Sequence, residues 1–207
     1  MPINLRQIIR DDVFDYLQLT EALSSYGNVW SKITRLLAGG EIIRLKKGLY
    51  TFPEPLRKAP LNPGIIANML YGPSYVSCDY ALSYYGLIPE KVELVTSMTT
   101  GRPREFKTPA GTYQYIQHRS HDYACGIRME KAAGSSFLIA EPEKAVYDKA
   151  LTDRRFNGTG IVEYLREDLR LDEEQLGGLN REVFLELHDL ARGKMRKLTK
   201  YLLETIR

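Results

Sequence analysis

Four prolines within eleven residues constrain this chain more than any other feature. The segment 53–63 reads PEPLRKAPLNP. Each proline removes a backbone hydrogen-bond donor and fixes φ, so this segment cannot form a helix interior or a central strand. We therefore expect a boundary here, with an N-terminal domain over residues 1–58 and a C-terminal domain over residues 59–207.

The excess positive charge of the chain lies almost entirely before this boundary. Residues 1–60 contain nine Lys and Arg and six Asp and Glu, whereas residues 61–207 contain 20 of each sign. The net charge of +3 therefore belongs to the first third of the chain. Such asymmetry indicates a polyanionic partner.

The apolar pattern argues against a membrane partner. No stretch approaches the roughly 18 consecutive apolar residues of a membrane span. The first residues, MPINLRQIIRDDVFDYL, lack the apolar run and the cleavage site of a signal peptide. Two cysteines cannot form a disulfide framework. We expect a cytoplasmic protein.

Three helices and a hairpin are predicted before the boundary. The helices are Ile3–Arg10, Leu17–Ser24 and Val29–Ala38, and the strands are Ile42–Leu45 and Leu49–Phe52. Gly39 and Gly40 end the third helix, since glycine tolerates the left-handed conformation found there. Gly48 serves the same purpose in the Lys-Lys-Gly turn of the hairpin.

A mixed pattern follows the boundary and predicts an α+β domain with a helical tail. The expected helices are Pro63–Leu70, Cys78–Tyr85 and Pro142–Leu151. The expected strands are Val92–Thr99, Glu105–Thr108, Gly111–His118, Gly126–Lys131 and Ser135–Ile139. From Gly160 the chain is predicted to be entirely helical, with a last helix near Lys194–Ile206.

The third predicted helix has a polar side without any acidic residue. Its apolar residues, within an arc of about 120° on a helical wheel, are Val29, Trp30, Ile33, Leu36 and Leu37. A hairpin that carries three more cations follows directly. This pattern predicts a winged helix-turn-helix that binds duplex DNA, with the helix reading base edges and the hairpin contacting phosphates. The predicted DNA contacts are Ser31, Lys32, Thr34, Arg35, Arg44, Lys46 and Lys47.

The segment ITRLLAGGEIIRLKKGLYTFPEP, residues 33–55, resembles the winged-helix motif of AbiEi-type antitoxins of type IV toxin–antitoxin systems. YVSCDYALSYYGLIPE (75–90), VELVTSMTT (92–100) and FLIAEPEKAVYDKAL (137–151) are similar to the antitoxin domain of that family. The resemblance covers about residues 15–151 and does not extend to the tail. It implies repression of the protein's own promoter at inverted repeats. It also implies a functional link to a nucleotidyltransferase-like toxin, and DNA contacts at Lys32, Arg35, Lys46 and Lys47.

Two groups of residues in the second half of the chain contain side chains that are common in catalytic or metal-binding sites. Glu141, Glu143, Lys144 and Asp148 could form a nuclease-like cluster, but Pro142 suits the first turn of a helix and Glu143 favours the helix dipole, so we prefer a structural role. His118, His121 and Cys125 have a metal-like spacing, but a structural zinc site normally needs a fourth ligand. We predict no enzyme activity, no metal and no cofactor.

Two further basic clusters are interpreted either as solvated surface or as additional contacts to DNA or an acidic partner. The first cluster comprises Arg192, Lys194, Arg196, Lys197 and Lys200. The second comprises Arg102, Arg104 and Lys107. The sequence predicts a DNA-binding repressor and antitoxin. The alternatives are a toxin-neutralising protein–protein module that binds no operator, and a nucleic-acid-processing enzyme.

Overall fold

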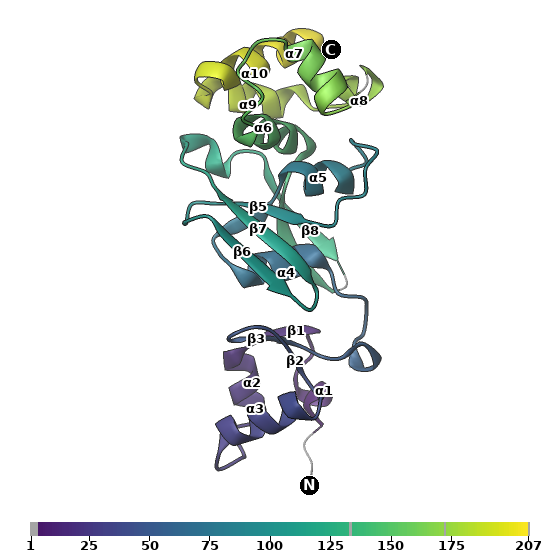
Figure 1. Cartoon of the computed structure of the whole chain (residues 1–207), viewed down its shortest axis with the longest axis vertical. Coiled ribbons are helices and arrows are strands. Elements are labelled where there is room, and N and C mark those ends of the chain that lie inside the picture. Colours follow the sequence, from purple (N-terminus) through teal and green to yellow (C-terminus); the bar gives the residue numbers. More distant parts are fainter. Residues whose placement is uncertain (1–3, 133, 172, 207) are drawn as a thin grey trace.

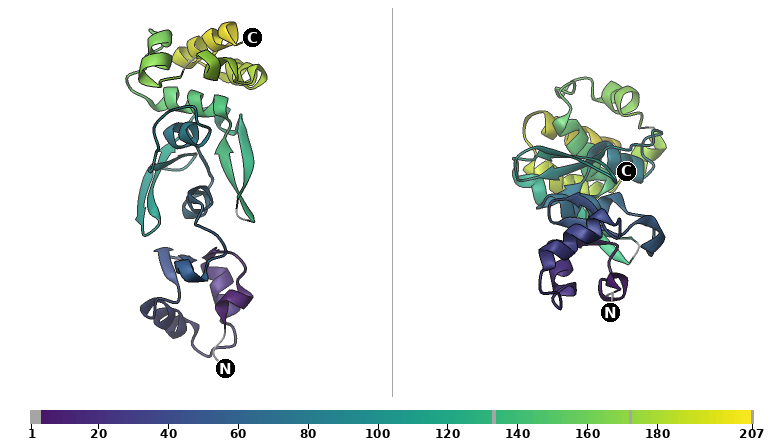
Figure 2. Two further views of the ribbon diagram at one scale, coloured as in Figure 1. Left: turned by 90° about the vertical axis from the view of Figure 1, so that its right-hand side faces the viewer. Right: turned by 60° about the horizontal axis from the view of Figure 1, so that its bottom comes forward.

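Helices and strands alternate along the chain in a mixed α+β arrangement, as the sequence predicts (Figure 1). The computed structural model describes residues 4–132, 134–171 and 173–206. We refer to residues 4–52 as the N-terminal unit and to residues 63–206 as the C-terminal unit. The N-terminal unit lies at one end of an elongated molecule, and the last helices of the C-terminal unit lie at the other end (Figures 1 and 2).

The N-terminal unit combines three helices with a small antiparallel sheet. Its elements in chain order are α1 (Leu5–Ile8), β1 (Val13–Asp15), α2 (Tyr16–Ala22), α3 (Val29–Ala38), β2 (Ile43–Lys46) and β3 (Leu49–Thr51). The strand order is β1-β3-β2. Helices α2 and α3 and the hairpin lie close to the predicted ranges, whereas α1 is half as long as the predicted helix Ile3–Arg10, whose first residue lies outside the described residues. Strand β1, which pairs with β3, was not predicted.

The small sheet is covered on both faces. Phe14 and Tyr50, which are directly opposite each other on β1 and β3, pack into the buried cluster under the helices. Val13, Leu45 and Leu49 instead belong to the buried cluster of the C-terminal unit. One face of the sheet therefore supports α3, and the other face is the junction with the rest of the protein.

The proline-rich segment between the units is fixed by Asp12. The carboxylate of Asp12 accepts hydrogen bonds from the backbone N–H groups of Lys58 and Ala59 at 3.1–3.2 Å. It also pairs with Arg6 at 2.6 Å. A short 3₁₀ helix, η1 (Glu54–Leu56), lies within the segment. The segment then ends at Pro63, the first residue of α4.

The C-terminal unit is built on a six-stranded mixed sheet with the order β6-β7-β5-β4-β9-β8. Its strands are β4 (Ser74–Val76), β5 (Val95–Thr99), β6 (Arg104–Thr108), β7 (Gly111–Gln117), β8 (Ile127–Ala132) and β9 (Ser135–Ala140). The pairs β5–β7 and β4–β9 are parallel, and the others are antiparallel. The five predicted strands are present with small shifts, and β4 is additional.

Helices cover this sheet and extend the molecule beyond it. They are α4 (Pro63–Leu70), α5 (Cys78–Tyr84), η2 (His121–Ala124), α6 (Pro142–Thr152), α7 (Ile161–Glu163), η3 (Tyr164–Asp168), α8 (Glu173–Gly177), α9 (Arg181–Leu190) and α10 (Gly193–Thr205). Helix α6 lies between the sheet and the terminal helices (Figure 1). Within the described ranges, no helix is long and apolar enough to cross a bilayer.

Candidate nucleic-acid interface

Helix α3 presents one buried and one exposed side, and its ends are fixed by local chemistry. The side chain of Asn28 caps the first turn by accepting a hydrogen bond from the Ser31 N–H at 2.9 Å. Ile33 and Leu36 are buried against the N-terminal cluster. The helix ends at Gly39 and Gly40, and Gly40 has the positive φ of 68° that favours glycine.

The exposed side of α3 carries predicted contacts of unequal accessibility. Arg35 and Thr34 are exposed, and the Thr34 hydroxyl donates to the carbonyl of Trp30 at 3.0 Å. Ser31 and Lys32 are half-buried. The Lys32 ammonium lies 5.3 Å from the centre of the Tyr26 ring, which positions this cation beside the helix. Arg35 is therefore the cation that projects most freely from α3.

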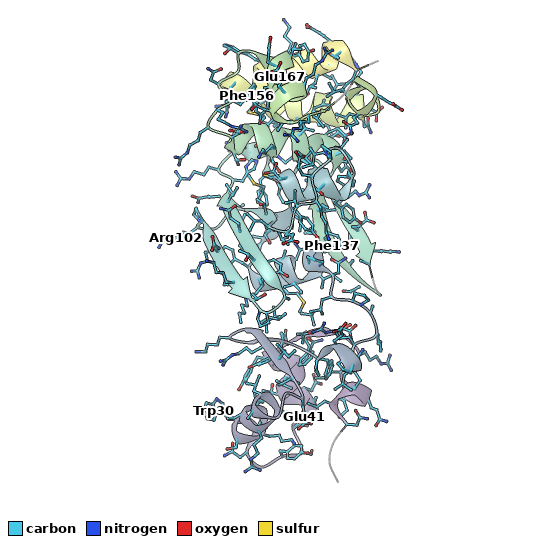
Figure 3. The ribbon with its side chains drawn as sticks, turned by 45° about the vertical axis from the view of Figure 1, so that its right-hand side comes forward. Trp30, Glu41, Arg102, Phe137, Phe156 and Glu167 are labelled. Atoms are coloured by element: carbon cyan, nitrogen blue, oxygen red, sulfur yellow. The ribbon has the colours of Figure 1, made fainter. Side chains whose placement is uncertain are left out.

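Trp30 does not lie in the apolar face where the helical wheel placed it. Its side chain is 73% exposed and projects away from the N-terminal unit (Figure 3). Buried Ile33 and Leu36 define the centre of the apolar face, and Trp30 stands at the margin of the predicted arc, next to Thr34. A place within the apolar arc of the wheel therefore does not bring burial for Trp30.

The three cations of the hairpin point in different directions. Arg44 and Lys47 are exposed. The Lys46 ammonium instead donates to the carbonyl of Leu70 at the end of α4 and lies 5.8 Å from the centre of the Phe106 ring. Burial, and secondarily the nearby charge of Arg104, lower the pKa of Lys46. Contrary to our expectation for a phosphate contact, Lys46 belongs to the junction between the units.

A β-bulge explains the different direction of Lys46. Arg44 is directly opposite Tyr50 on β3, whereas Lys46 is opposite Leu49, and the register shifts between Arg44 and Lys46. Paired residues share one face of a sheet, and the face of Leu49 is the one that packs against the C-terminal unit. Leu45 and Lys46 therefore both face the junction.

Of the basic cluster Arg102, Arg104 and Lys107, it is Arg104 that lies beside this junction. All three residues are exposed. Arg104 is close enough to influence the charge of Lys46, and its guanidinium lies 5.2 Å from the centre of the Tyr71 ring. In the view of Figure 3, Arg102 and Trp30 project from the same side of the molecule. The structure thus brings Arg104 near Lys46 of the hairpin, a proximity that sequence spacing did not indicate.

The cluster on the last helix is far from α3. Helix α10 lies at the opposite end of the molecule (Figure 1). Arg192, Arg196, Lys197 and Lys200 are exposed. Lys194 instead donates to the carbonyls of Ala150, Asp153 and Phe156 at 2.9–3.1 Å, so it stabilises the end of α6. The second basic contact proposed from the sequence therefore loses Lys194 and forms no single surface with α3.

Lys144 and Asp148 of α6 form a buried network with His118 and Asp122. The side chains of Lys144, Asp148, His118 and Asp122 are all 0% exposed. The Lys144 ammonium lies 3.2 Å from Asp148 Oδ1 and donates to the carbonyl of Asp122 at 2.8 Å. Because solvent does not reach these groups, a substrate would reach them only if the fold opened. The arrangement supports the structural interpretation of this segment.

The network connects α6 to the sheet. Asp148 Oδ2 accepts hydrogen bonds from the hydroxyls of Tyr75 at 2.9 Å and Ser77 at 2.7 Å. Burial disfavours ionisation of Asp122, but the hydroxyl of Tyr147 and the charge of Lys144 outweigh it and lower the pKa of Asp122. The spacing of four between Lys144 and Asp148, which lie on one predicted helix, was a sign of this network in the sequence.

The residues with metal-like spacing are not brought together. His118 is buried in the network, His121 is exposed, and the thiol of Cys125 lies 3.6 Å from a carboxylate oxygen of Glu186. Burial, followed by the interaction with Glu186, raises the pKa of Cys125 to about 11. Among the residues with described positions, no group of three or more His, Cys, Asp or Glu could hold a metal ion.

A solved structure resembles the whole chain. The RV2827C protein from Mycobacterium tuberculosis superimposes with a TM-score of 0.62 at 15% sequence identity, over 95% of this chain and 72% of that one. The two proteins therefore share a fold that includes both units. No family model matches the chain, and no curated protein matches it significantly.

Proposed function

We propose that the N-terminal unit is a winged helix-turn-helix and that the protein is a sequence-specific DNA-binding repressor. The order α1-β1-α2-α3-β2-β3, with a three-stranded antiparallel sheet, is the order of a winged helix. Helix α3 is then the recognition helix. The observation that carries the proposal is the exposed, acid-free side of α3 with Arg35 at its centre.

Charge and geometry both favour duplex DNA as the partner. An exposed arginine on a recognition helix can form two hydrogen bonds with a guanine edge. Arg44 and Lys47 add exposed cations in the same unit, and each phosphate that they neutralise would release counterions. Duplex DNA fits both observations, because its phosphates attract the exposed cations and its major groove is wide enough for a helix.

The test is binding to the DNA upstream of the protein's own gene, measured by fluorescence anisotropy over a range of salt concentrations. We expect affinity to fall steeply with salt, as for a protein that contacts several phosphates. Arg35→Ala should weaken binding by about 1–3 kcal/mol and relax specificity at one base pair. Arg181→Ala, an exposed arginine on α9, serves as the matched control and should bind as the wild type does. Equal affinity of Arg35→Ala and the wild type would refute the assignment of α3.

We further propose that the repressor is the antitoxin of a type IV toxin–antitoxin system. This part rests on the sequence resemblance of residues 15–151 to AbiEi-type antitoxins. It is tested by expressing the adjacent reading frame with and without this protein. Growth arrest by a nucleotidyltransferase that this chain relieves would support the role, and arrest that persists in its presence would contradict it. Relief by a chain that binds no upstream DNA would favour the protein–protein module instead.

A further inference from the structure

The exposed tryptophan of α3 packs little against the fold. Trp30 is the single tryptophan of the chain, and its 73% exposure exceeds that of every other large hydrophobic side chain in the described ranges. Tryptophan is highly buried on average in folded proteins. Leaving its indole in water therefore forfeits favourable burial that a partner can restore.

The surroundings of Trp30 indicate what kind of partner fits. It is the second residue of α3 and lies one turn before Thr34, whose hydroxyl bonds to its carbonyl. Arg35 is exposed on the next turn, and α3 contains no acidic residue. Trp30 thus adds an apolar surface to a helix whose only charged residues are cations, and this combination is complementary to a partner with both negative charge and apolar groups. Duplex DNA has both, because its phosphates flank grooves that contain thymine methyl groups.

The position along the helix favours a contact at the groove floor. Residues in the N-terminal part of a recognition helix contact base edges, whereas later residues approach the backbone. We propose that Trp30 enters the major groove with α3 and packs its indole against the methyl groups of thymines in the binding site. This inference rests on the proposed function and adds a residue that selects sequence by apolar contact.

The first experiment uses the fluorescence of Trp30 itself. A duplex is selected from a random library by the full-length wild-type protein, and binding is measured independently by the anisotropy of a labelled copy. Unlabelled duplex is then added to the protein. The tryptophan is excited at a wavelength that the tyrosines do not absorb, and its emission is recorded. We expect the emission to change in parallel with binding, because the indole leaves water. Binding without any change in emission would overturn the inference but leave the proposed function intact.

The second experiment separates the indole from the thymine methyl. Trp30→Ala should weaken binding about tenfold, which corresponds to about 1.4 kcal/mol. Trp30→Phe should bind within about threefold of the wild type, because an aromatic ring remains. Replacing thymine by uracil in the duplex removes the methyl groups alone. The wild type should lose affinity for the uracil duplex, and Trp30→Ala should not distinguish the two duplexes. A wild type that binds both equally would overturn the methyl contact.

Two controls distinguish a DNA contact of Trp30 from a role in folding or in self-association. Because Trp30 packs little against the fold, Trp30→Ala should leave the midpoint of urea unfolding almost unchanged. Sedimentation of the free protein should be the same for wild type and Trp30→Ala. If the variant instead dissociates an oligomer, Trp30 is a contact between copies of the chain and the inference is wrong. If the wild type enriches no sequence from the library, the proposed function itself fails.

Discussion

Replacing Lys144 by methionine should destabilise the protein strongly, although the side chain is far from the proposed interface. Methionine keeps most of the aliphatic stem and removes only the ammonium. That ammonium lies 3.2 Å from Asp148 Oδ1, and both side chains are 0% exposed. Removing one partner of a buried ion pair leaves an uncompensated buried charge, which costs about 3–5 kcal/mol. We expect Lys144→Met to lower the unfolding free energy by that amount.

Lys149 on the same helix provides the matched control. Its ammonium lies 2.7 Å from Asp79, closer than in the buried pair, but the two side chains are 20% and 41% exposed. Exposed ion pairs contribute about 0–1 kcal/mol, because water screens the charges and holding two long side chains in one geometry costs conformational entropy. If burial rather than distance decides the effect, Lys149→Met should cost several times less than Lys144→Met. Urea unfolding at constant protein concentration measures both losses, and an unchanged slope shows that a variant altered stability alone.

A double variant tests the physical reason. Adding Asp148→Asn to Lys144→Met removes the orphaned charge while retaining an acceptor for the hydroxyls of Tyr75 and Ser77. The double variant should therefore be less destabilised than the sum of the two single variants. Equal losses for Lys144→Met and Lys149→Met, or strict additivity in the double variant, would refute the reasoning about the buried network.

Three other predictions follow from individual contacts. Lys47→Ala should reduce the slope of log binding constant against log salt concentration by about one. Lys46→Ala should leave this slope unchanged and lower the melting temperature. Equal slopes for the two variants would contradict the assignment of Lys47 to the DNA interface and Lys46 to the junction. The hydrogen bonds from Arg155 lower the pKa of Asp153 to about 2, so its contribution to stability is present above about pH 4 and is lost as the pH falls toward 2. Carboxyl titration by NMR should show a higher pKa in Arg155→Gln, and an unchanged value would refute this cause. Lys194→Met should lower the unfolding free energy by about 1–2 kcal/mol, because three carbonyls lose a half-buried donor; a loss under about 0.5 kcal/mol would show that water replaces it.

Elements with strong local signals were predictable from the sequence. Helix α4 begins at Pro63 after the capping residue Asn62, and α3 extends from the Asn28 cap to a glycine pair. In both cases the bounds agree with the prediction. Proline at the first helical position and glycine past the end act within a few residues, so no tertiary context is needed. The domain division at residue 58 and the assignment of function remain predictions.

Elements that depend on distant partners were not predictable. Strands β1 and β4 have three residues each, too few for a periodic pattern, and unlike β3, which is equally short, neither follows a predicted hairpin turn. Strand β1 exists because it pairs with β3, and β4 because it lies between β5 and β9. The buried network has the same origin, since His118 and Asp148 are far apart in the sequence and meet only in the folded chain. No local pattern could have assigned the network's geometry.

The hairpin shows how one irregularity changes the proposed site. In a regular strand, Arg44 and Lys46 would project from the same face, because side chains alternate with a period of two. The bulge between them turns Lys46 toward Leu70 and leaves Arg44 on the face of Tyr50, which is the side of the helices. A hairpin whose other face is buried against the C-terminal unit can offer DNA only its turn and its helix-side cations. The proposed interface therefore consists of α3, Arg44 and Lys47, and Lys46 instead fixes the orientation of that surface relative to the C-terminal unit.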